Sequence, residues 1–345
     1  MRKKAKNNQP PSKKIHPSEL RQDIVSGDWI VLATGRARRP EDFVKKRIGK
    51  RQKAPVAGCP FENPQATGHG QPFLVYKNHK DWEIQIIPNK YPALTHRDVC
   101  PLPLSRGPFS VLDGVGHHDI LITRDHGKNF PALKPRIAEL VFQALRDRYL
   151  MLFNDPCLAY VSIFHNWGPT AGASIFHPHF QSIAVPVVPP DIRHSLNGSK
   201  RYFDEHKKCV HCVIIDWEKN QKKRVIFENK GAIAFTPFVS REPFEIRVFP
   251  KKHLPYFENT RDEDIADVVG VLQNVLKKVE KNLNDPDYNF FIHTAPMREK
   301  EQSGHYHWHI EIRPKIATPA GFELGTGMEI NVVDPDIAVK ILKSK

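Results

Sequence analysis

The sequence predicts an α+β protein built from two tandem copies of one unit, each an antiparallel sheet with a packed amphipathic helix. Residues 118–188 and 244–314 share one order of elements: strand, histidine-containing loop, amphipathic helix, strand, loop, and a strand with an H-x-H pair. The expected helices, 136–152 and 262–281, both carry apolar side chains at a period of 3.6 residues. The loop histidine precedes the H-x-H pair by 51 residues in the first copy and by 54 in the second. Shared order and shared spacing indicate a duplication.

The duplication also predicts the boundaries of the units. Residues 1–16 are basic and are followed by no apolar stretch, so we expect a disordered tail rather than a secretory signal. The first unit, which we expect to be the catalytic one, spans 17–195, and the second spans 205–345. The segment His194–Lys208 is the expected linker between them.

Composition narrows the class of partner and the cellular compartment. Lys and Arg number 52 against 38 Asp and Glu, and the formal charge of +14 favours anionic partners such as nucleotides, sugar phosphates or nucleic acid. No apolar run is long enough for a transmembrane helix. Five cysteines are too few, and odd in number, for a disulfide scaffold. We therefore expect a cytoplasmic protein in which Cys100 and Cys157 are small core or surface residues.

The first H-x-H pair carries the strongest chemical signal. Alternate residues of a strand point to one face, so His177 and His179 present neighbouring imidazoles and Gln181 continues the row. A single histidine is more often structural, but three polar side chains in an apolar neighbourhood are costly unless they bind something. The preceding segment 166–174 (NWGPTAGAS) contains small residues that allow backbone N–H groups to approach an anion.

A second anion-binding candidate lies near the N-terminus. Arg36 and Arg39 follow an expected strand at 28–33, and arginines at a strand end can clamp a phosphate. A solvated basic surface is the alternative for such a run of charges.

A cysteine and histidine set in the second unit has the composition of a zinc site. Cys209 and Cys212 form a CxxC pair, and His253 and His307 follow downstream. Two thiolates and two imidazoles make a closed tetrahedral shell. A redox pair remains an alternative for the CxxC, and His309 rivals His307 because the two share a strand face.

The first unit carries a matching set in which one cysteine is replaced. Its members are Cys59, Glu62, His126 and His177. A carboxylate is an acceptable zinc ligand, although an empty site with Glu62 on the surface is the alternative. Together the two sets predict one or two zinc ions per chain.

These motifs resemble a known family. HPHFQ at 177–181, behind NWGPTAGAS, resembles the active-site motif of galactose-1-phosphate uridylyltransferases, which belong to the histidine-triad superfamily and contain two fused repeats. CPFEN at 59–63 resembles the family's CPFC segment without its second cysteine, and NKYPAL at 89–94 resembles a nucleoside-contacting segment. GFELGTGMEIN at 321–331 resembles the family's C-terminal sugar-phosphate loop, especially that of the ADP-glucose phosphorylase branch, and CVHC at 209–212 also resembles that branch. The resemblance covers roughly residues 17–345.

The resemblance implies a role for individual residues. His179 would be the nucleophile that takes a nucleoside monophosphate onto its imidazole, and Gln181 would hold the phosphoryl oxygens. Cys59, His126 and His177 would bind zinc. The implied substrate-binding residues are Arg36, Arg39, Asn89, Asn166, Ser174, Phe322, Gly325 and Gly327.

The expected function is nucleotidyl transfer between a nucleotide sugar and a sugar 1-phosphate. We expect a UDP-glucose–hexose-1-phosphate uridylyltransferase of galactose metabolism, with an ADP-glucose phosphorylase-like adenylyltransferase, using phosphate as acceptor, as the alternative. A zinc-dependent nucleic-acid-binding module leaves HPHFQ unexplained, and a simple nucleotide hydrolase also ranks behind. We therefore expect no nucleic-acid or membrane partner. The resemblance alone suggests a homodimer.

The two units are not expected to be equally active. The second H-x-H strand reads HWHIE, so Glu311 occupies the position of Gln181. A carboxylate would repel an incoming phosphate, whereas an amide can donate hydrogen bonds to it. We therefore expect a single active site, in the first unit.

Overall fold

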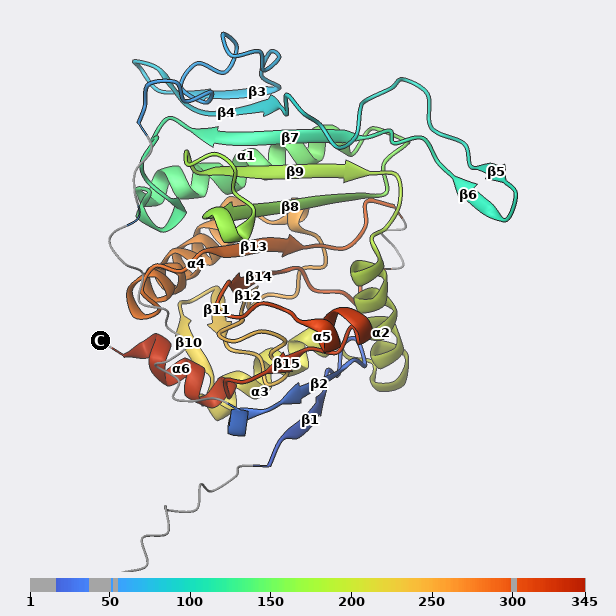
Figure 1. Cartoon of the computed structure of the whole chain (residues 1–345), viewed down its shortest axis with the longest axis vertical. Helices are drawn as coiled ribbons and strands as arrows, with labels where there is room; N and C mark the ends of the chain where they lie inside the picture. Colours follow the sequence, from blue (N-terminus) through green and yellow to red (C-terminus); the bar gives the residue numbers. More distant parts are fainter. Residues whose placement is uncertain (1–16, 37–50, 52–54, 299–302, 345) are drawn as a thin grey trace, which may run out of the picture.

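The computed structural model describes residues 17–36, 51, 55–298 and 303–344. Within these residues, one ten-stranded antiparallel sheet forms the centre of the molecule (Figure 1). Its strands are β3 (Leu74–Lys77), β4 (Trp82–Pro88), β7 (His117–Thr123), β8 (Tyr160–Trp167), β9 (His179–Val185), β10 (Val225–Glu228), β11 (Ala232–Phe235), β12 (Ile246–Pro250), β13 (Tyr288–His293) and β14 (His309–Pro314).

The two halves of this sheet follow the same order. From the outer edge to the centre, the first half runs β3-β4-β7-β9-β8 and the second runs β10-β11-β12-β14-β13. Strands β8 and β13 meet at the centre, where Tyr288 lies opposite Trp167 and Ile292 opposite Ile163. In both halves a long helix connects two strands that follow each other along the chain. Helix α1 (Pro135–Leu152) connects β7 to β8, and α4 (Asp262–Asn282) connects β12 to β13. We interpret the halves as two copies of one α+β unit that share a sheet.

The two long helices cover one face of the sheet and build the core. Helices α1 and α4 contact each other, and their apolar stripes join a single cluster with strand residues such as Phe180 and Phe290. Burying each such side chain stabilises the fold by about 1.5–3 kcal/mol. The predicted helices are confirmed to within one residue at each end. Because Phe180 faces the helices, its neighbours His179 and Gln181 on β9 point to the opposite face, where Phe61 packs on Ile120 and Ile122 of β7.

The predicted linker is wrong, because the chain is helical and packed there. Helix α2 (Pro190–His206) covers most of that segment, and α3 (Val210–Gln221) follows. Pro190 stands at the first helical position, which suits a residue with no N–H to donate. Gly198 lies so close to the backbone of Val25 that an added Cβ would be 1.6 Å from its carbonyl oxygen. Helix α2 is therefore pressed against the N-terminal segment.

The two ends of the chain meet in a small three-stranded sheet. Its strands are β1 (Glu19–Gln22), β2 (Trp29–Leu32) and β15 (Ile330–Asn331), with β15 parallel to β2. The predicted strand at 28–33 is confirmed as β2. This small sheet packs against the second half, where Arg241 pairs with Asp28 at 2.9 Å. Residues 19–32, which the sequence assigned to the first unit, therefore contact the second.

The remaining elements are short. Residues 321–331, expected to form a loop, instead contain α5 (Gly321–Thr326) and β15, and α6 (Pro335–Lys343) follows. The hairpin β5 (Leu104–Arg106) and β6 (Phe109–Val111) projects from the body beside β7 (Figure 1). Among the described helices, none has the length and apolarity that crossing a bilayer requires. The expected tail, residues 1–16, lies outside the described residues.

Candidate active site and metal centres

His179 is held in one orientation by main-chain carbonyl contacts. Its strand begins at His179 rather than at His177, and its Nδ1–H donates to the carbonyl of His177 at 2.9 Å. The lone pair therefore lies on Nε2. From the core side, Nδ1 of His165 lies 2.9 Å from the carbonyl oxygen of His179 and steadies that peptide. Burial lowers the pKa of His179, so the imidazole is neutral near pH 7. A neutral, oriented imidazole is suited to nucleophilic attack.

Gln181 is oriented by a residue that the sequence analysis did not select, His118 on β7. Nδ1 of His118 accepts a hydrogen bond from the backbone N–H of Ala93 at 3.1 Å, so Nε2 carries the proton. That Nε2–H donates to Oε1 of Gln181 at 2.9 Å. Nδ2 of Asn89 lies 3.0 Å from the same ring nitrogen. The amide oxygen of Gln181 is thereby engaged, and its NH2 group is oriented for an incoming phosphoryl group.

His118 could have been suspected only from the HHD sequence that opens its strand. Without the register between β7 and β9, nothing in the sequence separates it from its neighbour His117.

The small-residue loop before β9 is fixed by the second half of the sheet. Gly168 and Gly172 adopt φ values of +88° and +87°, which other residues rarely tolerate. The carboxylate of Asp287 accepts hydrogen bonds from the backbone N–H and the hydroxyl of Thr170, at 2.8 and 2.7 Å. Asn166 accepts a hydrogen bond from Asn289 on β13 at 2.8 Å. Ser174, the last residue of this segment, is exposed.

The first metal set comes together in space beside His179. The ligand atoms of Cys59, Glu62, His126 and His177 all lie within 4.8 Å of one another. Oε1 of Glu62 is 3.0 Å from Nδ1 of His126, so Glu62 faces the cluster rather than the solvent. His177 donates its Nε2–H to the Thr123 carbonyl at 2.8 Å, which leaves Nδ1 as the ligand atom. An anchored second ring nitrogen is usual for a zinc-binding histidine, so these residues fit zinc.

The second metal set is the counterpart of the first and is closed by two cysteines. Sγ of Cys212 lies 3.4 Å from Nδ1 of His253 and 3.5 Å from Nδ1 of His307, and Cys209 completes the group. His253 donates Nε2–H to the Gly304 carbonyl, and His307 donates to that of Pro250. The geometry selects His307 over its rival His309, which joins a different cluster with His293 and Glu311. His211, between the two cysteines, lies outside this set.

The second half replaces the amide site with a buried ionic network. Arg247 lies opposite Glu311 in the second half, just as Ile120 lies opposite Gln181 in the first. Glu245, two residues before Arg247, therefore occupies the position that His118 has in the first half. Arg313 contacts Glu311 at 2.5 Å. Burial alone would raise the pKa of Glu311, but Arg313, followed by His293 and Arg247, holds it well below its usual range. A fixed carboxylate at this position disfavours phosphate, which supports a single active site in the first half.

Several residues expected to bind substrate lie away from His179. Arg36 is exposed just after β2, and Phe322 and Gly325 lie on α5, with Gly327 at its end. These elements accompany the small sheet beside the second half, whereas β7 and β9 belong to the first half (Figure 1). Arg39 lies outside the described residues.

The expectation for two of the cysteines is wrong. Cys100 and Cys157 form a disulfide with their Cα atoms 4.9 Å apart, across a sequence separation of 57 residues. The long segment between β4 and β7 passes over the turn between α1 and β8, which no local sequence pattern reveals. Cys59, Cys209 and Cys212 are free thiols.

The fold and site, together with the relatives of this chain, define a nucleotidyltransferase. A family model described as a domain of unknown function (DUF4921) matches residues 134–344. The chain is 34% identical over 333 residues to the ADP-glucose phosphorylase of Arabidopsis thaliana, covering 94% of this chain and 92% of that protein. It is 26% identical over 334 residues to the galactose-1-phosphate uridylyltransferase of Thermotoga maritima, covering 94% and 98%.

Solved structures agree with these sequence relatives. The crystal structure of the Arabidopsis thaliana ADP-glucose phosphorylase with bound ADP-glucose has a TM-score of 0.80 at 30% identity, covering 95% of this chain and 99% of that one. A uridylyltransferase structure has a TM-score of 0.72 at 25% identity, covering 94% and 97%. The chain belongs to the galactose-1-phosphate uridylyltransferase-like family, which includes the ADP-glucose phosphorylase branch.

Proposed function

We propose that this enzyme moves a nucleoside monophosphate from a nucleotide sugar to an acceptor phosphate through a covalent intermediate on His179. We further propose that ADP-glucose is its donor and inorganic phosphate its acceptor. The observation that carries the chemistry is the oriented Nε2 of His179, beside the amide of Gln181. The preference for ADP-glucose is supported by the 34% identity to an ADP-glucose phosphorylase and by the Cys209–Cys212 set that resembles that branch.

The first step forms the covalent intermediate. The Nε2 lone pair of His179 attacks the α-phosphorus, the N–P bond forms, and the bond from phosphorus to the bridging oxygen breaks. The glucose 1-phosphate leaves with that bond's electron pair. The NH2 group of Gln181 donates to the phosphoryl oxygens as negative charge builds on them, which lowers the barrier.

The second step regenerates the enzyme. An oxygen of inorganic phosphate attacks the same phosphorus, and the new P–O bond joins the phosphate to the adenylyl group as ADP. The N–P bond breaks, its electron pair returns to Nε2 of His179, and ADP leaves. Because His179 returns to its neutral form, no net change of the enzyme occurs over the cycle.

Zinc has a structural role in this proposal. The Cys59 set would fix His177, whose carbonyl orients Nδ1 of His179. The Cys209 set would join α3 to the turn after β12 and to the segment before β14. Bound zinc would supply fixed geometry at both places, and this chain's own residues carry the transfer chemistry.

Uridylyl transfer is the second candidate. The 26% identity to a galactose-1-phosphate uridylyltransferase over nearly its whole length supports it. In that reaction the donor would be UDP-glucose and the acceptor a hexose 1-phosphate, with the same attack by His179.

We also propose that the enzyme works as a homodimer. Within one chain Arg36 and α5 accompany the second half, while His179 lies in the first. A second copy could place its own Arg36 and α5 beside this chain's His179, so that each site draws on both chains.

A labelling experiment separates the two donors. The protein is incubated with ADP-glucose or UDP-glucose carrying a radioactive α-phosphate, and the label retained on the denatured protein is measured. We expect ADP-glucose to label the wild-type protein, and phosphate to release the label as ADP. Labelling by UDP-glucose alone, with release by galactose 1-phosphate, would favour the second candidate. Equal labelling of wild type and His179→Ala would exclude the covalent mechanism on this residue.

A further inference from the structure

A third group of ligand-type side chains lies apart from the active site and from both zinc sets. It consists of His96, His117 and Asp155, whose ligand atoms all lie within 4.8 Å of one another. Consecutive strand residues point to opposite faces, so His117 faces the helix side of the sheet while His118 faces the active site. The cluster therefore belongs to a different surface from the nucleotide chemistry.

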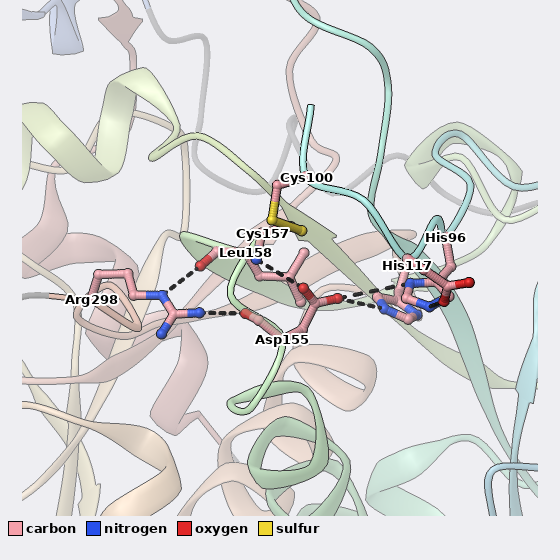
Figure 2. Close-up of a disulfide and its surroundings, with 8 residues drawn as sticks. His96, Cys100, His117, Asp155, Cys157, Leu158 and Arg298 are labelled. Carbon is pink, nitrogen blue, oxygen red and sulfur yellow. Dashed lines mark hydrogen bonds and ion pairs between the residues drawn. A yellow bond between two sulfur atoms is a disulfide. The ribbon is translucent and has the colours of Figure 1, made fainter. Parts of the chain in front are cut away.

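The three side chains converge on one carboxylate oxygen. Oδ2 of Asp155 lies 3.3 Å from Nε2 of His117 and 3.8 Å from Nδ1 of His96. The two imidazoles stack with their centroids 4.6 Å apart (Figure 2). Two ligand atoms of a tetrahedral zinc ion lie about 3.3 Å apart. The distance between Nδ1 of His96 and Oδ2 of Asp155 therefore needs to shorten only slightly for the three residues to surround a metal.

Asp155 is oriented toward the two rings by its own contacts. Its Oδ1 accepts the backbone N–H of Cys157 at 2.9 Å, which leaves Oδ2 directed at the imidazoles. Arg298 donates to the main-chain carbonyl of Asp155 and to that of Leu158, and so fixes the turn from its other side (Figure 2). The Asp155 and His117 side chains are only 15% and 14% exposed, while His96 is 51% exposed. Two partly buried ligands with an exposed third allow a metal to enter from the solvent.

The disulfide joins the same two segments as the cluster. His96 and Cys100 lie four residues apart on one segment, and Asp155 and Cys157 lie two apart on the other. The Cys100–Cys157 bond therefore holds His96 close to Asp155 without a metal. Such preorganisation lowers the cost of bringing a loop residue into a binding site.

We propose that His96, His117 and Asp155 bind one divalent transition-metal ion, with zinc as the metal of choice and water in the remaining position. Two imidazoles and a carboxylate, with no thiolate, suit zinc, cobalt and nickel better than magnesium or calcium. Burial lowers the pKa of His117, so its ring is neutral and competent to bind at pH 7. Asp98 lies 3.6 Å from Nε2 of His96, on the far side of that ring from Asp155. Asp119 and Arg148, also near His117, pair with each other at 2.8 Å. This site is independent of the proposed function.

Cobalt binding to zinc-loaded protein tests the proposal. The full chain is loaded with zinc and treated with a weak chelator until only the two cysteine-containing sets retain zinc, which leaves the His96 cluster empty. It is then dialysed against increasing Co2+, and bound cobalt is measured by elemental analysis and by its visible spectrum. Zinc holds its sites against cobalt, so the cysteine-containing sets stay occupied. We expect one Co2+ per chain without a thiolate-to-cobalt charge-transfer band. No uptake, or uptake accompanied by that band, would overturn the proposal.

Three variants make the test specific. His96→Ala should lose this cobalt, and because His96 is exposed its thermal unfolding midpoint should match that of the wild type. His79→Ala, which removes an exposed histidine outside the cluster, should bind as the wild type does. His117→Gln should also lose the cobalt. Unchanged binding in both His96→Ala and His117→Gln would disprove the site.

The contribution of the disulfide is measured separately. In Cys100→Ser/Cys157→Ser protein, or after reduction with a phosphine that does not bind the metal, we expect cobalt affinity to fall at least tenfold. Undiminished affinity would show that the disulfide does not preorganise the ligands.

Discussion

At the scale of single residues, the two halves differ in what surrounds an imidazole of the same geometry. His309 donates its Nδ1–H to the His307 carbonyl at 3.1 Å, as His179 does to that of His177. His309 stacks on Phe249 and His293 at 4.7 and 4.9 Å and lies beside charged residues. His179 lies beside a neutral amide. The surroundings, not the histidine itself, distinguish a candidate nucleophile from its counterpart.

Replacing each histidine tests that distinction. We expect His179→Ala to abolish labelling by the nucleotide sugar and to leave the fold nearly intact. His309→Ala should keep the labelling, because it removes only the counterpart. Autoradiography of denatured protein measures both. Labelling that survives in His179→Ala and vanishes in His309→Ala would place the active site in the second half.

The neutral amide of Gln181 gives a second prediction. Gln181→Glu introduces the residue that the second half carries at position 311, and its carboxylate repels the transferred phosphoryl group. We expect the transfer rate to fall at least about tenfold, which corresponds to roughly 1.4 kcal/mol of transition-state stabilisation. Single-turnover kinetics at saturating donor measure the change. A rate equal to that of the wild type would show that Gln181 makes no contact with the phosphoryl group.

Buried His165 makes stability depend on pH. Burial lowers its pKa to about 3, whereas the unfolded chain titrates near the ordinary value of about 6.5. Below pH 6.5 the unfolded state therefore binds a proton that the folded state does not, and stability falls as the pH falls toward 3. The loss is roughly 1.4 kcal/mol per pH unit from this one group.

The His165→Gln variant removes that proton while keeping a donor for the His179 carbonyl. Urea unfolding at pH 7, 6 and 5 should show a smaller pH slope for His165→Gln than for wild type or for His79→Gln, whose histidine is exposed. Parallel slopes for all three proteins would show that His165 does not contribute.

At the scale of elements, the sequence predicted the helices and strands whose own side chains follow a regular pattern. The periodic stripes located α1 and α4 to within one residue, because an amphipathic helix needs only its own side chains to be recognised. The strands with H-x-H were also found, but each begins at its second histidine, since the first turns toward the metal set. Helix α2 was missed because it is polar on most positions and is buried only where Ile192, Gly198 and Ser199 contact other segments.

The stability of helix α3 is expected to depend on the metal ligands in its first turn. Cys209 stands at the N-cap position and Cys212 lies within the first turn, so a metal held by both would join this helix to His253 and His307. We expect Cys209→Ser to lower the zinc content by one ion per chain and to lower the thermal unfolding midpoint, because metal binding contributes directly to folding free energy. Elemental analysis and calorimetry measure the two effects.

The rival ligand provides the control for that experiment. His309→Ala should keep the zinc that Cys209→Ser loses, because His309 lies in another cluster. Unchanged zinc in Cys209→Ser, or loss in His309→Ala, would refute this ligand set.

At the scale of the whole molecule, the contacts that the sequence could not predict are those between its distant parts. The pairing of β15 with β2 joins residues 330–331 to residues 31–32, and the disulfide joins residues 100 and 157. The duplicated spacing predicted which cysteine, histidine and glutamate side chains come together in the two ligand sets, and their ligand atoms do lie close to one another. That these sets bind zinc stays a prediction. The role of His118 could not be predicted, because it depends on the register between β7 and β9. The position of Arg36 beside the second half could not be predicted either, because it depends on how the two ends of the chain pair.

The position of Arg36 leads to a prediction about assembly. If each active site combines His179 of one chain with Arg36 of another, then His179→Ala and Arg36→Ala chains are each impaired alone, but a mixed dimer contains one intact site. We expect co-expressed, differently tagged chains to regain roughly half of the wild-type activity per dimer, because one of its two sites carries neither change. Sequential affinity purification on the two tags isolates the mixed dimer for assay. A site formed within one chain would leave that dimer as impaired as its parents, and a monomeric sedimentation profile would exclude sharing between chains.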